Sequence, residues 1–284
     1  MSKLARWVRG AGLTGACGPD APRGGTSAVG YNMKIRWEKP MNAHKWTLMA
    51  AALLVWQCGC ATMSPTPRNP MPAFGKGARI LFQGDSITDG NRGRNTDPNH
   101  ILGHGYQALI ASRYGADLPE RHLTFMNRGI SGNTVSALAR RWQTDTLDLK
   151  PDLLSILIGV NDLNSGVSAE RYEQQYNQLL ADTVKALPNT RLVLCEPFGL
   201  PIGGKKDPWE KYRADLAARQ ALVAKLGEKY HAPVVHFQKM FDDATQRAPA
   251  DYWIWDGIHP TYAGHQLMAD EWVRAVRAAW PERK

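Results

Sequence analysis

A serine stands where a predicted strand ends, a position from which its hydroxyl can reach a ligand. The apolar run Arg79–Gly84 leads directly into Asp85 and Ser86, and Asp89-Gly90 follow. A serine hydroxyl becomes an effective nucleophile when a neighbouring base removes its proton. The segment is not the G-x-S-x-G elbow of α/β-hydrolases, because the second glycine is missing. Ser86 is therefore a candidate nucleophile, with a helix-capping serine as the alternative interpretation.

A candidate base lies near the other end of the chain, in the segment Asp256-Gly257-Ile258-His259-Pro260. Histidine exchanges protons readily near neutral pH, and it acts best as a base when a carboxylate fixes its tautomer and stabilises the imidazolium. Asp256 precedes His259 by three residues with a glycine between them, so its carboxylate can fold back onto the ring. The pattern Asp-x-x-His is common in proteins, and it indicates chemistry only in combination with other residues.

Two loops could supply hydrogen-bond donors for a charged reaction intermediate. Arg128–Asn133 follows the second predicted strand, and Gly159–Asp162 follows the third. Acyl transfer needs donors aimed at the developing oxyanion, and backbone N–H groups in glycine-rich turns and Asn amides are suited to this. Gly132 and Asn161 are the candidates. An ordinary turn at Gly132 and a helix cap at Asn133 or Asn161 remain the alternatives.

Short apolar runs alternate with longer helical patterns between Gly77 and Lys284. Strands are predicted at Arg79–Gly84, Leu123–Asn127, Leu153–Ile158, Arg191–Cys195 and Val234–Phe237. Helices are predicted near Gly105–Tyr114, Val135–Leu149, Ala169–Ala186, Tyr212–Lys229 and Tyr262–Ala279. The alternation predicts an α/β fold, a single three-layer α/β/α domain with a five-stranded parallel sheet over residues 77–284. Ligands bind such sheets beyond the carboxyl ends of the strands, where the candidate residues cluster.

The four candidate segments, taken in order, resemble the four sequence blocks of the SGNH (GDSL-type) hydrolase family. The resemblance extends from Ile80 to His265. The strings Asn127–Gly132 and Ile156–Asp162 are typical of the carbohydrate-ester branch of that family. Thr88 replaces the leucine of the GDSL motif, which is a common variant in the family.

This resemblance implies a flavodoxin-like sheet and a serine esterase that works through a covalent acyl-enzyme. In the family pattern Ser86 is the nucleophile, His259 is the base and Asp256 orients the base. The backbone N–H groups of Ser86 and Gly132 and the side-chain amide of Asn161 form the oxyanion hole. No metal or organic cofactor is implied.

The expected substrate is a short-chain ester, an acetyl group on a carbohydrate. Trp253 and Trp255 stand directly before Asp256 with the spacing of a strand, and they either stack on a sugar or pack in the core. A lipase, a lysophospholipase or a thioesterase of the same family is the alternative function. A carbohydrate-binding lipoprotein without catalysis is the alternative from another class, although binding alone needs no activated nucleophile.

The amino-terminal part of the chain is interpreted as targeting sequence. Residues 1–40 show no regular pattern and are taken as an upstream leader, so that Met33 or Met41 competes with Met1 as the start of translation. Residues 41–60 contain a short basic segment, then an apolar run of about 11 residues, and then small residues where cleavage would occur. This order is typical of a secretory signal.

A cysteine at the end of this signal predicts lipidation. Cys60 follows Gly59, as the first residue of a mature bacterial lipoprotein would, and the proline-rich residues 61–76 then form an extended tether. Plain secretion, an uncleaved anchor or a buried helix remain alternatives. The protein is therefore expected outside the cytoplasm, in the periplasm, on the outer membrane or secreted, with membrane contact only through a lipid anchor.

Charge and composition exclude several classes of protein. The net charge is +9, but eight of the 35 Lys/Arg and two of the 26 Asp/Glu precede residue 61, which leaves only +3 for residues 61–284. A nearly neutral body does not favour nucleic acid as a partner. No apolar run reaches the roughly 18 residues that span a membrane, so a polytopic membrane protein is excluded.

Three further segments could suggest a ligand. Gly199–Lys206 fits a phosphate-binding loop, but Lys206 occupies the Ser/Thr position and a helix-breaking Asp-Pro follows, so nucleotide binding is not favoured. His100 and His104 lack accompanying cysteines or suitably spaced carboxylates, which favours a surface loop over a metal site. Cys195 lies in an apolar run and is interpreted as a core residue.

Overall fold

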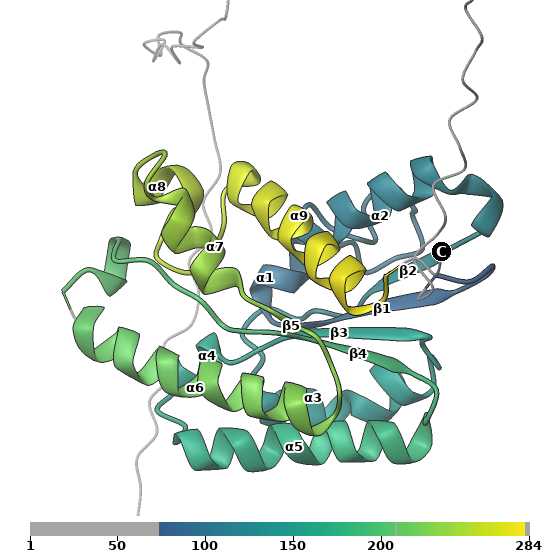
Figure 1. The fold of residues 1–284 in the computed structure, drawn as a ribbon, viewed down its shortest axis with the longest axis horizontal. Coiled ribbons are helices and arrows are strands. Elements are labelled where there is room, and N and C mark those ends of the chain that lie inside the picture. The colour runs from purple at the N-terminus through teal and green to yellow at the C-terminus, as the bar shows by residue number, and fades with distance from the viewer. Residues whose placement is uncertain (1–73, 208, 282–284) are drawn as a thin grey trace, which may run out of the picture. The chain divides into compact units, whose positions relative to one another are not determined.

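The computed structural model describes residues 74–207 and 209–281, all of which belong to the second of the chain's two units, Pro65–Lys284. Five parallel strands form one sheet in the order β2-β1-β3-β4-β5 (Figure 1). Their bounds are Arg79–Gly84 (β1), Thr124–Asn127 (β2), Leu153–Leu157 (β3), Arg191–Cys195 (β4) and Val234–Val235 (β5). The predicted five-stranded parallel sheet is confirmed, and the first four strands lie within one residue of their predicted bounds.

Helices cover both faces of this sheet and give the predicted three layers (Figure 1). On one face lie α2 (Tyr106–Asp117), α7 (Phe237–Ala244), α8 (Ala250–Trp253) and α9 (Tyr262–Ala279). On the other face lie α3 (Val135–Trp142), α5 (Ala169–Ala186) and α6 (Trp209–Lys229). Two apolar cores result, one on each side of the sheet.

The central strand β3 explains why the sequence of this region is almost continuously apolar. All five of its residues are buried. Leu153 and Leu157 belong to the core beneath α2 and α9, whereas Leu154 and Ile156 belong to the core beneath α3 and α5. A parallel strand that is covered on both faces needs apolar side chains in both directions.

The helix predicted at Val135–Leu149 is interrupted. Regular α3 ends at Trp142, and Gln143–Leu147 form a π-helical turn. The wider turn brings the Asp145 carbonyl and the Thr146 hydroxyl to the buried Gln83 amide, at 2.8 and 2.7 Å from its Nε2. Hydrophobic periodicity does not contain this information, because the turn depends on a polar partner from β1.

The predictions between Val234 and Trp255 are wrong in two details. The strand predicted at Val234–Phe237 ends at Val235, and Phe237 instead begins α7, with its ring fully buried. The tryptophans before Asp256 do not share a strand, since Trp253 ends α8 and Ile254 forms an isolated antiparallel bridge with Pro260.

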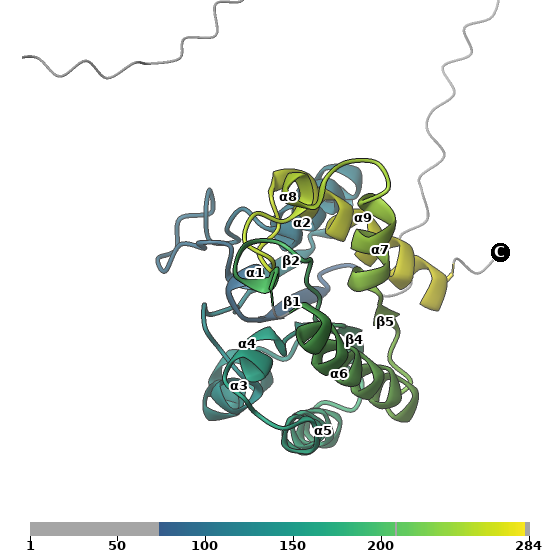
Figure 2. The same cartoon turned by 90° about the vertical axis from the view of Figure 1, so that its left-hand side faces the viewer.

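Two short helices mark the functional end of the sheet. One residue, Asp85, separates α1 (Ser86–Asp89) from β1, and two residues separate α4 (Val160–Asn164) from the end of β3 at Leu157. Both lie at the carboxyl ends of their strands, and Figure 2 looks onto this end. Two 3₁₀ turns complete the described elements, at Pro119–Arg121 and Gly203–Lys205.

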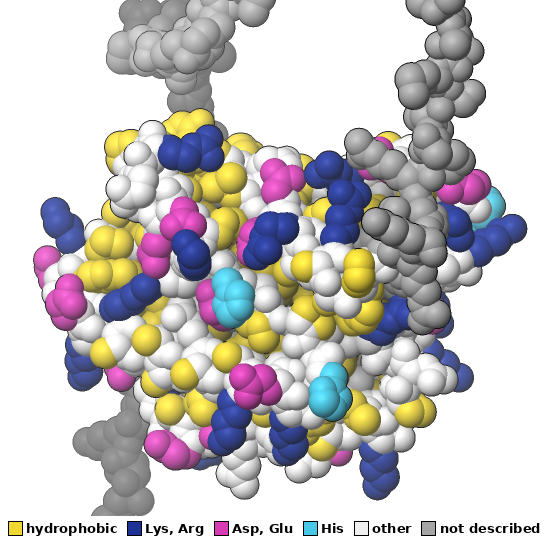
Figure 3. Space-filling model, in the orientation of Figure 1, with side chains coloured by type: hydrophobic (Ala, Val, Ile, Leu, Met, Phe, Trp, Pro, Cys, Tyr) yellow, Lys and Arg dark blue, Asp and Glu magenta, His cyan; other side chains and the backbone are white. Residues whose placement is uncertain are grey.

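The surface drawn in Figure 3 carries basic and acidic side chains interspersed over the same face. No helix within residues 74–207 and 209–281 is long and apolar enough to cross a membrane. The predicted leader, signal segment, lipidated Cys60 and the tether up to residue 73 lie outside the described residues.

Candidate active site

The candidate nucleophile, base and acid lie in one hydrogen-bonded row. Ser86 Oγ is 2.7 Å from His259 Nε2, although the two residues are 173 positions apart. On the other side of the ring, His259 Nδ1 is 2.7 Å from Asp256 Oδ2. When Nδ1–H donates to the carboxylate, Nε2 is left as the acceptor for the serine hydroxyl. The arrangement can therefore remove the proton from Ser86.

Asp256 is held as a charged carboxylate by its own loop. Its Oδ1 accepts hydrogen bonds from the backbone N–H groups of Ile258 and His259, at 3.1 and 2.8 Å. Partial burial raises the pKa of Asp256, but the hydrogen bonds from the His259 ring and from these two N–H groups outweigh burial and bring the pKa below its usual value of 3.8. Gly257, at φ +107°, allows the tight turn between acid and base.

A short antiparallel closure fixes this loop. Ile254 pairs with Pro260, and the Trp255 N–H donates to the His259 carbonyl at 3.0 Å. The loop that carries Asp256 and His259 is thus tied at its base, directly before Thr261 caps α9.

The local structure leaves the Ser86 hydroxyl free for His259. Asp85, not Ser86, caps α1, because its Oδ1 accepts the Ile87 N–H at 3.0 Å. Burial raises the pKa of Asp85 to about 7, and nearby Asp162 adds to the effect. Gly84 is required sterically, since a Cβ there would collide with the Leu157 carbonyl on β3. The helix-cap interpretation of Ser86 is therefore wrong.

Gly132 and Asn161 lie on the loops that follow β2 and β3. Gly132 has φ +79°. No described atom outside its chain neighbours lies within 4 Å of the position that a Cβ on Gly132 would occupy. The Asn161 amide Nδ2 donates one hydrogen bond to the Asn133 carbonyl at 3.1 Å. The helix-cap alternatives for Asn133 and Asn161 are wrong, because other residues occupy the N-cap positions, Thr134 in α3 and Gly159 in α4.

An arginine that sequence reasoning missed connects the loop around Asn133 to the end of β1. Arg141 is largely buried, and its Nε donates to Asn133 Oδ1 at 2.9 Å. The same guanidinium pairs with Asp145 at 3.0 Å and reaches the Gly84 carbonyl at 3.5 Å. Arg141 therefore joins the residue that holds the Asn161 amide to the turn that precedes Ser86, and the π-helical turn supplies its counter-ion.

A second buried charge fastens the loop around Gly132 to α1. Asp89 accepts hydrogen bonds from the Ser131 N–H and hydroxyl at 3.0 and 3.1 Å, and from Arg94 at 2.7 Å. Burial raises the pKa of Asp89, but the bonds from Arg94 and Ser131 outweigh it and lower the pKa below 3.8. A Cβ on Gly129 would collide with the Asp89 backbone, so the loop packs directly on the helix.

The two tryptophans have different environments. Trp253 is 5% exposed, and its indole N–H donates to the Ala248 carbonyl at 3.2 Å. Trp255 is 66% exposed and stacks on the His259 ring, with 6.0 Å between centroids and 23° between planes. A buried ring face cannot stack on a ligand, so the burial of Trp253 does not support a sugar-stacking role for it, and only Trp255 retains that expectation.

The remaining segments from the sequence analysis form no separate site. The loop around Gly199–Lys206 packs on the loop that carries Asp256 and His259, with the Leu200 N–H donating to the Gly257 carbonyl at 2.9 Å. Lys205 lies over the Tyr212 ring. The part of the chain that the structure describes holds no group of three or more His, Cys, Asp or Glu placed to bind a metal, His100 and His104 included. The Cys195 prediction is confirmed, since its thiol is fully buried.

Comparison with known proteins shows which family the chain belongs to. The model of the GDSL-like lipase/acylhydrolase family matches residues 82–267. An acetylxylan esterase of Geobacillus stearothermophilus is 31% identical over 219 residues, which cover 73% of this chain and 97% of that protein.

Solved structures give the same result. A GDSL-like lipase of Parabacteroides merdae is 41% identical, with a TM-score of 0.68 over 72% of this chain and 97% of that one. The structure of an acetylxylan esterase from G. stearothermophilus is 30% identical, with a TM-score of 0.66 over 75% and 100% of the two chains. The chain is therefore a member of the GDSL-like lipase/acylhydrolase family, also called SGNH hydrolases, and a carboxylic-ester hydrolase.

Proposed function

We propose that the protein removes short acyl groups, acetyl groups above all, from an acylated carbohydrate through a Ser86-His259-Asp256 triad and an acyl-enzyme. The observation that carries the proposal is the row of two 2.7 Å contacts from Ser86 through His259 to Asp256. A non-catalytic carbohydrate-binding protein has no need of this row, because binding does not require an activated hydroxyl.

The reaction proceeds in two halves. Ser86 Oγ attacks the ester carbonyl while His259 Nε2 takes the hydroxyl proton, and collapse of the tetrahedral intermediate expels the sugar alcohol, which receives that proton from His259. A water molecule then attacks the acyl-enzyme, again with His259 as the base. Carboxylic acid leaves and the serine is restored. Asp256, kept ionised by its lowered pKa, stabilises the imidazolium in both halves.

Three donors stabilise the oxyanion in this proposal. They are the backbone N–H groups of Ser86 and Gly132 and the second N–H of the Asn161 amide, whose first N–H is engaged by Asn133. Donors that are fixed before the reaction need no reorganisation as charge develops. The open space beside Gly132 leaves room for the carbonyl oxygen.

The carbohydrate part of the proposal rests on two observations. The relative that is 31% identical is named an acetylxylan esterase. In this chain the exposed Trp255 ring, stacked beside the base, offers an indole face of the kind that sugar rings stack on. The polar side chains Asn91, Arg92, Arg94 and Asn95 follow the nucleophile and can bond to sugar hydroxyls.

We expect p-nitrophenyl acetate to be the best of the simple esters, with kcat/KM falling by butyrate and close to zero by octanoate. An acyl trough would do the opposite, because two further buried methylenes at about 0.8 kcal/mol each raise kcat/KM for butyrate about fifteenfold. Steady-state kinetics over the ester series measure this. A rise in kcat/KM from acetate to octanoate favours the lipase alternative, and no hydrolysis of any ester favours the binding protein.

Trp255→Ala is expected to lower kcat/KM for acetylated xylo-oligosaccharides several-fold more than for p-nitrophenyl acetate, which has no sugar to stack. Tyr252→Ala is the matched control, because Tyr252 is 57% exposed on the same segment but lies outside the stack with His259. Equal losses on both substrates would show that Trp255 supports His259 and does not bind sugar.

Arg141→Met is expected to lower kcat between about ten- and a hundredfold with little change in KM, since a donor displaced by an ångström loses most of its benefit in the transition state. Arg141→Lys keeps one charged donor and should recover part of the rate. Arg140→Met, on the exposed side of the same helix, is the control. A rise in KM at constant kcat contradicts a positioning role through Asn133.

We also propose that Cys60 is lipidated and anchors the protein to a membrane, as Gly59-Cys60 after an apolar leader indicates. Cys60→Ser should move the protein from the membrane fraction to the soluble fraction, whereas Cys58→Ser should not. Fractionation of cells that express each variant measures this. An unchanged distribution for both variants favours simple secretion or an uncleaved anchor.

A further inference from the structure

Four arginines surround two aspartates next to the loop that carries Gly132. Asp89 pairs with Arg94 at 2.7 Å, and Asp145 pairs with Arg141 at 3.0 Å. The other two arginines, Arg92 and Arg128, interact electrostatically with this group and raise its positive charge. Both carboxylates are already engaged, so two positive charges remain without a carboxylate partner among the described residues.

Of Arg92 and Arg128, Arg128 has the fewer hydrogen bonds from its guanidinium group. It is half-buried, and its Nε is a buried donor without a hydrogen-bond partner in residues 74–207 and 209–281. Arg92 is also half-buried, and its Nε donates only to the Gly129 carbonyl at 2.9 Å. Burial lowers the pKa of Arg92, and the neighbouring Arg94 and Arg128 lower it further, whereas Asp89 and Asp145 offset only part of this effect. Half-buried cations that repel one another are stabilised by an anion between them.

Arg92, Arg94 and Arg128 line a pocket of about 430 Å³ at the β2 edge of the sheet. One wall is the segment between α1 and α2, which projects beside α1 in Figure 2, and the other is β2 with the residue after it. The lining combines charged, polar and apolar side chains, among them Arg92, Arg94, Asn95, Phe125, Met126 and Arg128. Apolar surface for a ring and guanidinium groups for a charge are what an acidic sugar requires.

The pocket adjoins the proposed active site through the backbone. Arg128 directly precedes the loop Gly129–Asn133, and Arg92 bonds to the Gly129 carbonyl. Asp89, which follows Ser86 on α1, fastens Ser131 of this loop. The same short loop therefore connects the pocket to Gly132, one of the proposed oxyanion donors.

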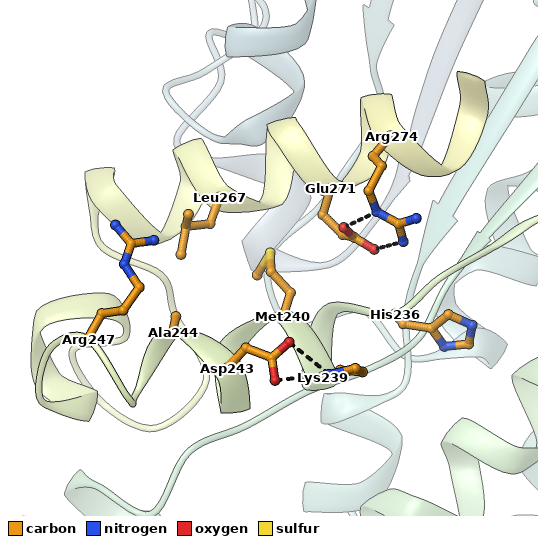
Figure 4. A pocket seen from close by; sticks show the side chains of 9 residues that line it. All are labelled: His236, Lys239, Met240, Asp243, Ala244, Arg247, Leu267, Glu271 and Arg274. Carbon is orange, nitrogen blue, oxygen red and sulfur yellow. Dashed lines mark hydrogen bonds and ion pairs between the residues drawn. The ribbon is translucent and has the colours of Figure 1, made fainter. Parts of the chain in front are cut away.

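The groove between α7 and α9, shown in Figure 4, serves as a contrast. It is as large, at about 490 Å³, and it is also lined by charges. There, however, Lys239 pairs with Asp243 and Arg274 with Glu271, and Arg247 lies over the Trp253 ring. Two of its three Lys/Arg side chains thus form ion pairs within the groove, whereas neither Arg92 nor Arg128 forms an ion pair with a carboxylate of the described residues.

We infer that the pocket lined by Arg92 and Arg128 binds the carboxylate of an acidic sugar unit next to the acylated one, so that acidic oligosaccharides are the favoured substrates. The inference rests on the proposed function for its carbohydrate. A guanidinium binds a carboxylate through two parallel N–H bonds, which gives the pocket preference for a uronic acid over a neutral sugar.

The test measures binding separately from turnover. In a Ser86→Ala background, titration calorimetry at low ionic strength compares an acetylated xylo-oligosaccharide that carries one glucuronic acid with the matching neutral compound. We expect the acidic compound to bind about tenfold more tightly, because a hydrogen-bonded charge pair of this kind is worth a factor of this order. The preference should shrink with added salt.

Arg128→Met in the same background should bring the ratio of the two affinities close to one. Arg128 is chosen over Arg92 because it makes no hydrogen bond to the Gly129–Asn133 loop. Arg140→Met, which removes an exposed arginine on α3, should leave the ratio unchanged. Equal affinities, no binding of either compound, or a preference that survives Arg128→Met each overturns the inference.

The proposed function is tested independently in the wild-type protein. Acetate release from the neutral compound supports the carbohydrate esterase whatever the acidic group does. Hydrolysis of p-nitrophenyl acetate without acetate release from either oligosaccharide rejects the carbohydrate substrate, while the calorimetric result still decides whether the pocket recognises a carboxylate.

Discussion

Ser86→Ala should lower kcat at least about 10³-fold on p-nitrophenyl acetate and on acetylated oligosaccharides alike. Without the hydroxyl no acyl-enzyme forms, and the residual rate depends on the oxyanion donors and on binding alone. Among the residues that the structure describes, the Ser86 hydroxyl makes one hydrogen bond, the one with His259 at 2.7 Å, so the fold is expected to survive the change. The rate of acetate release measures kcat, and a thermal unfolding curve shows whether the fold is retained.

Ser112→Ala is the control for this change, because Ser112 is exposed on α2 and bonds only to its own helix. It should leave kcat unaltered. If Ser86→Ala retains more than a tenth of the wild-type kcat and unfolds at the same temperature, the hydroxyl is not the nucleophile and the row of contacts has another purpose.

Asn161→Ala should lower kcat by about 10²–10³-fold, roughly 3 kcal/mol in the barrier, with KM little changed. The amide donates to an oxygen that becomes charged only in the transition state, so its loss weakens catalysis more than binding. One of its N–H groups is held by the Asn133 carbonyl at 3.1 Å, which fixes the direction of the other. Steady-state kinetics on p-nitrophenyl acetate separate the two parameters.

Asn189→Ala, in the exposed turn before β4, provides the comparison and should match the wild-type protein. A tenfold rise in KM at unchanged kcat after Asn161→Ala would instead place the amide in ground-state binding, and the oxyanion hole proposed here would then lack its side-chain donor.

The strands and the proposed triad of Ser86, His259 and Asp256 could be predicted because the sequence signals of each segment are local. β1, β3 and β4 are runs of mainly apolar residues that any parallel sheet must bury. Polar residues follow β1 directly, at Asp85 and Ser86, and follow β3 after three apolar residues, at Asn161 and Asp162. Asp256 and His259 are three residues apart, so one tight turn suffices to join them. The meeting of Ser86 with His259 follows from the fold, since both lie at the carboxyl end of the sheet.

The supporting contacts could not be predicted, because each depends on residues that are distant in sequence. In the sequence, Arg141 resembles any other polar residue on a helix. Its contacts with Asn133 and Gly84 exist only in the folded chain. Asp89 looks like a surface acid, yet it is 3% exposed and holds Ser131 from 42 positions away. The π-helical turn likewise forms because Gln83 of β1 supplies a buried amide.

The tryptophans show how a short pattern misleads. Alternation over Tyr252–Trp255 fits a strand, but Pro249 and the packing of Trp253 against the core start a turn of helix instead. Of the two tryptophans, Trp255 is exposed to solvent and Trp253 is buried, although the sequence pattern does not distinguish them.

Labelling with a fluorophosphonate tests the central claim most directly, because the reagent reacts only with a hydroxyl that a base has activated. The wild-type protein should take up one label per chain, and peptide mapping should place it on Ser86. Ser86→Ala should take up none, and His259→Ala should react far more slowly. A label on Ser131 or Ser155, or a wild-type protein that is not labelled at all, would contradict the account.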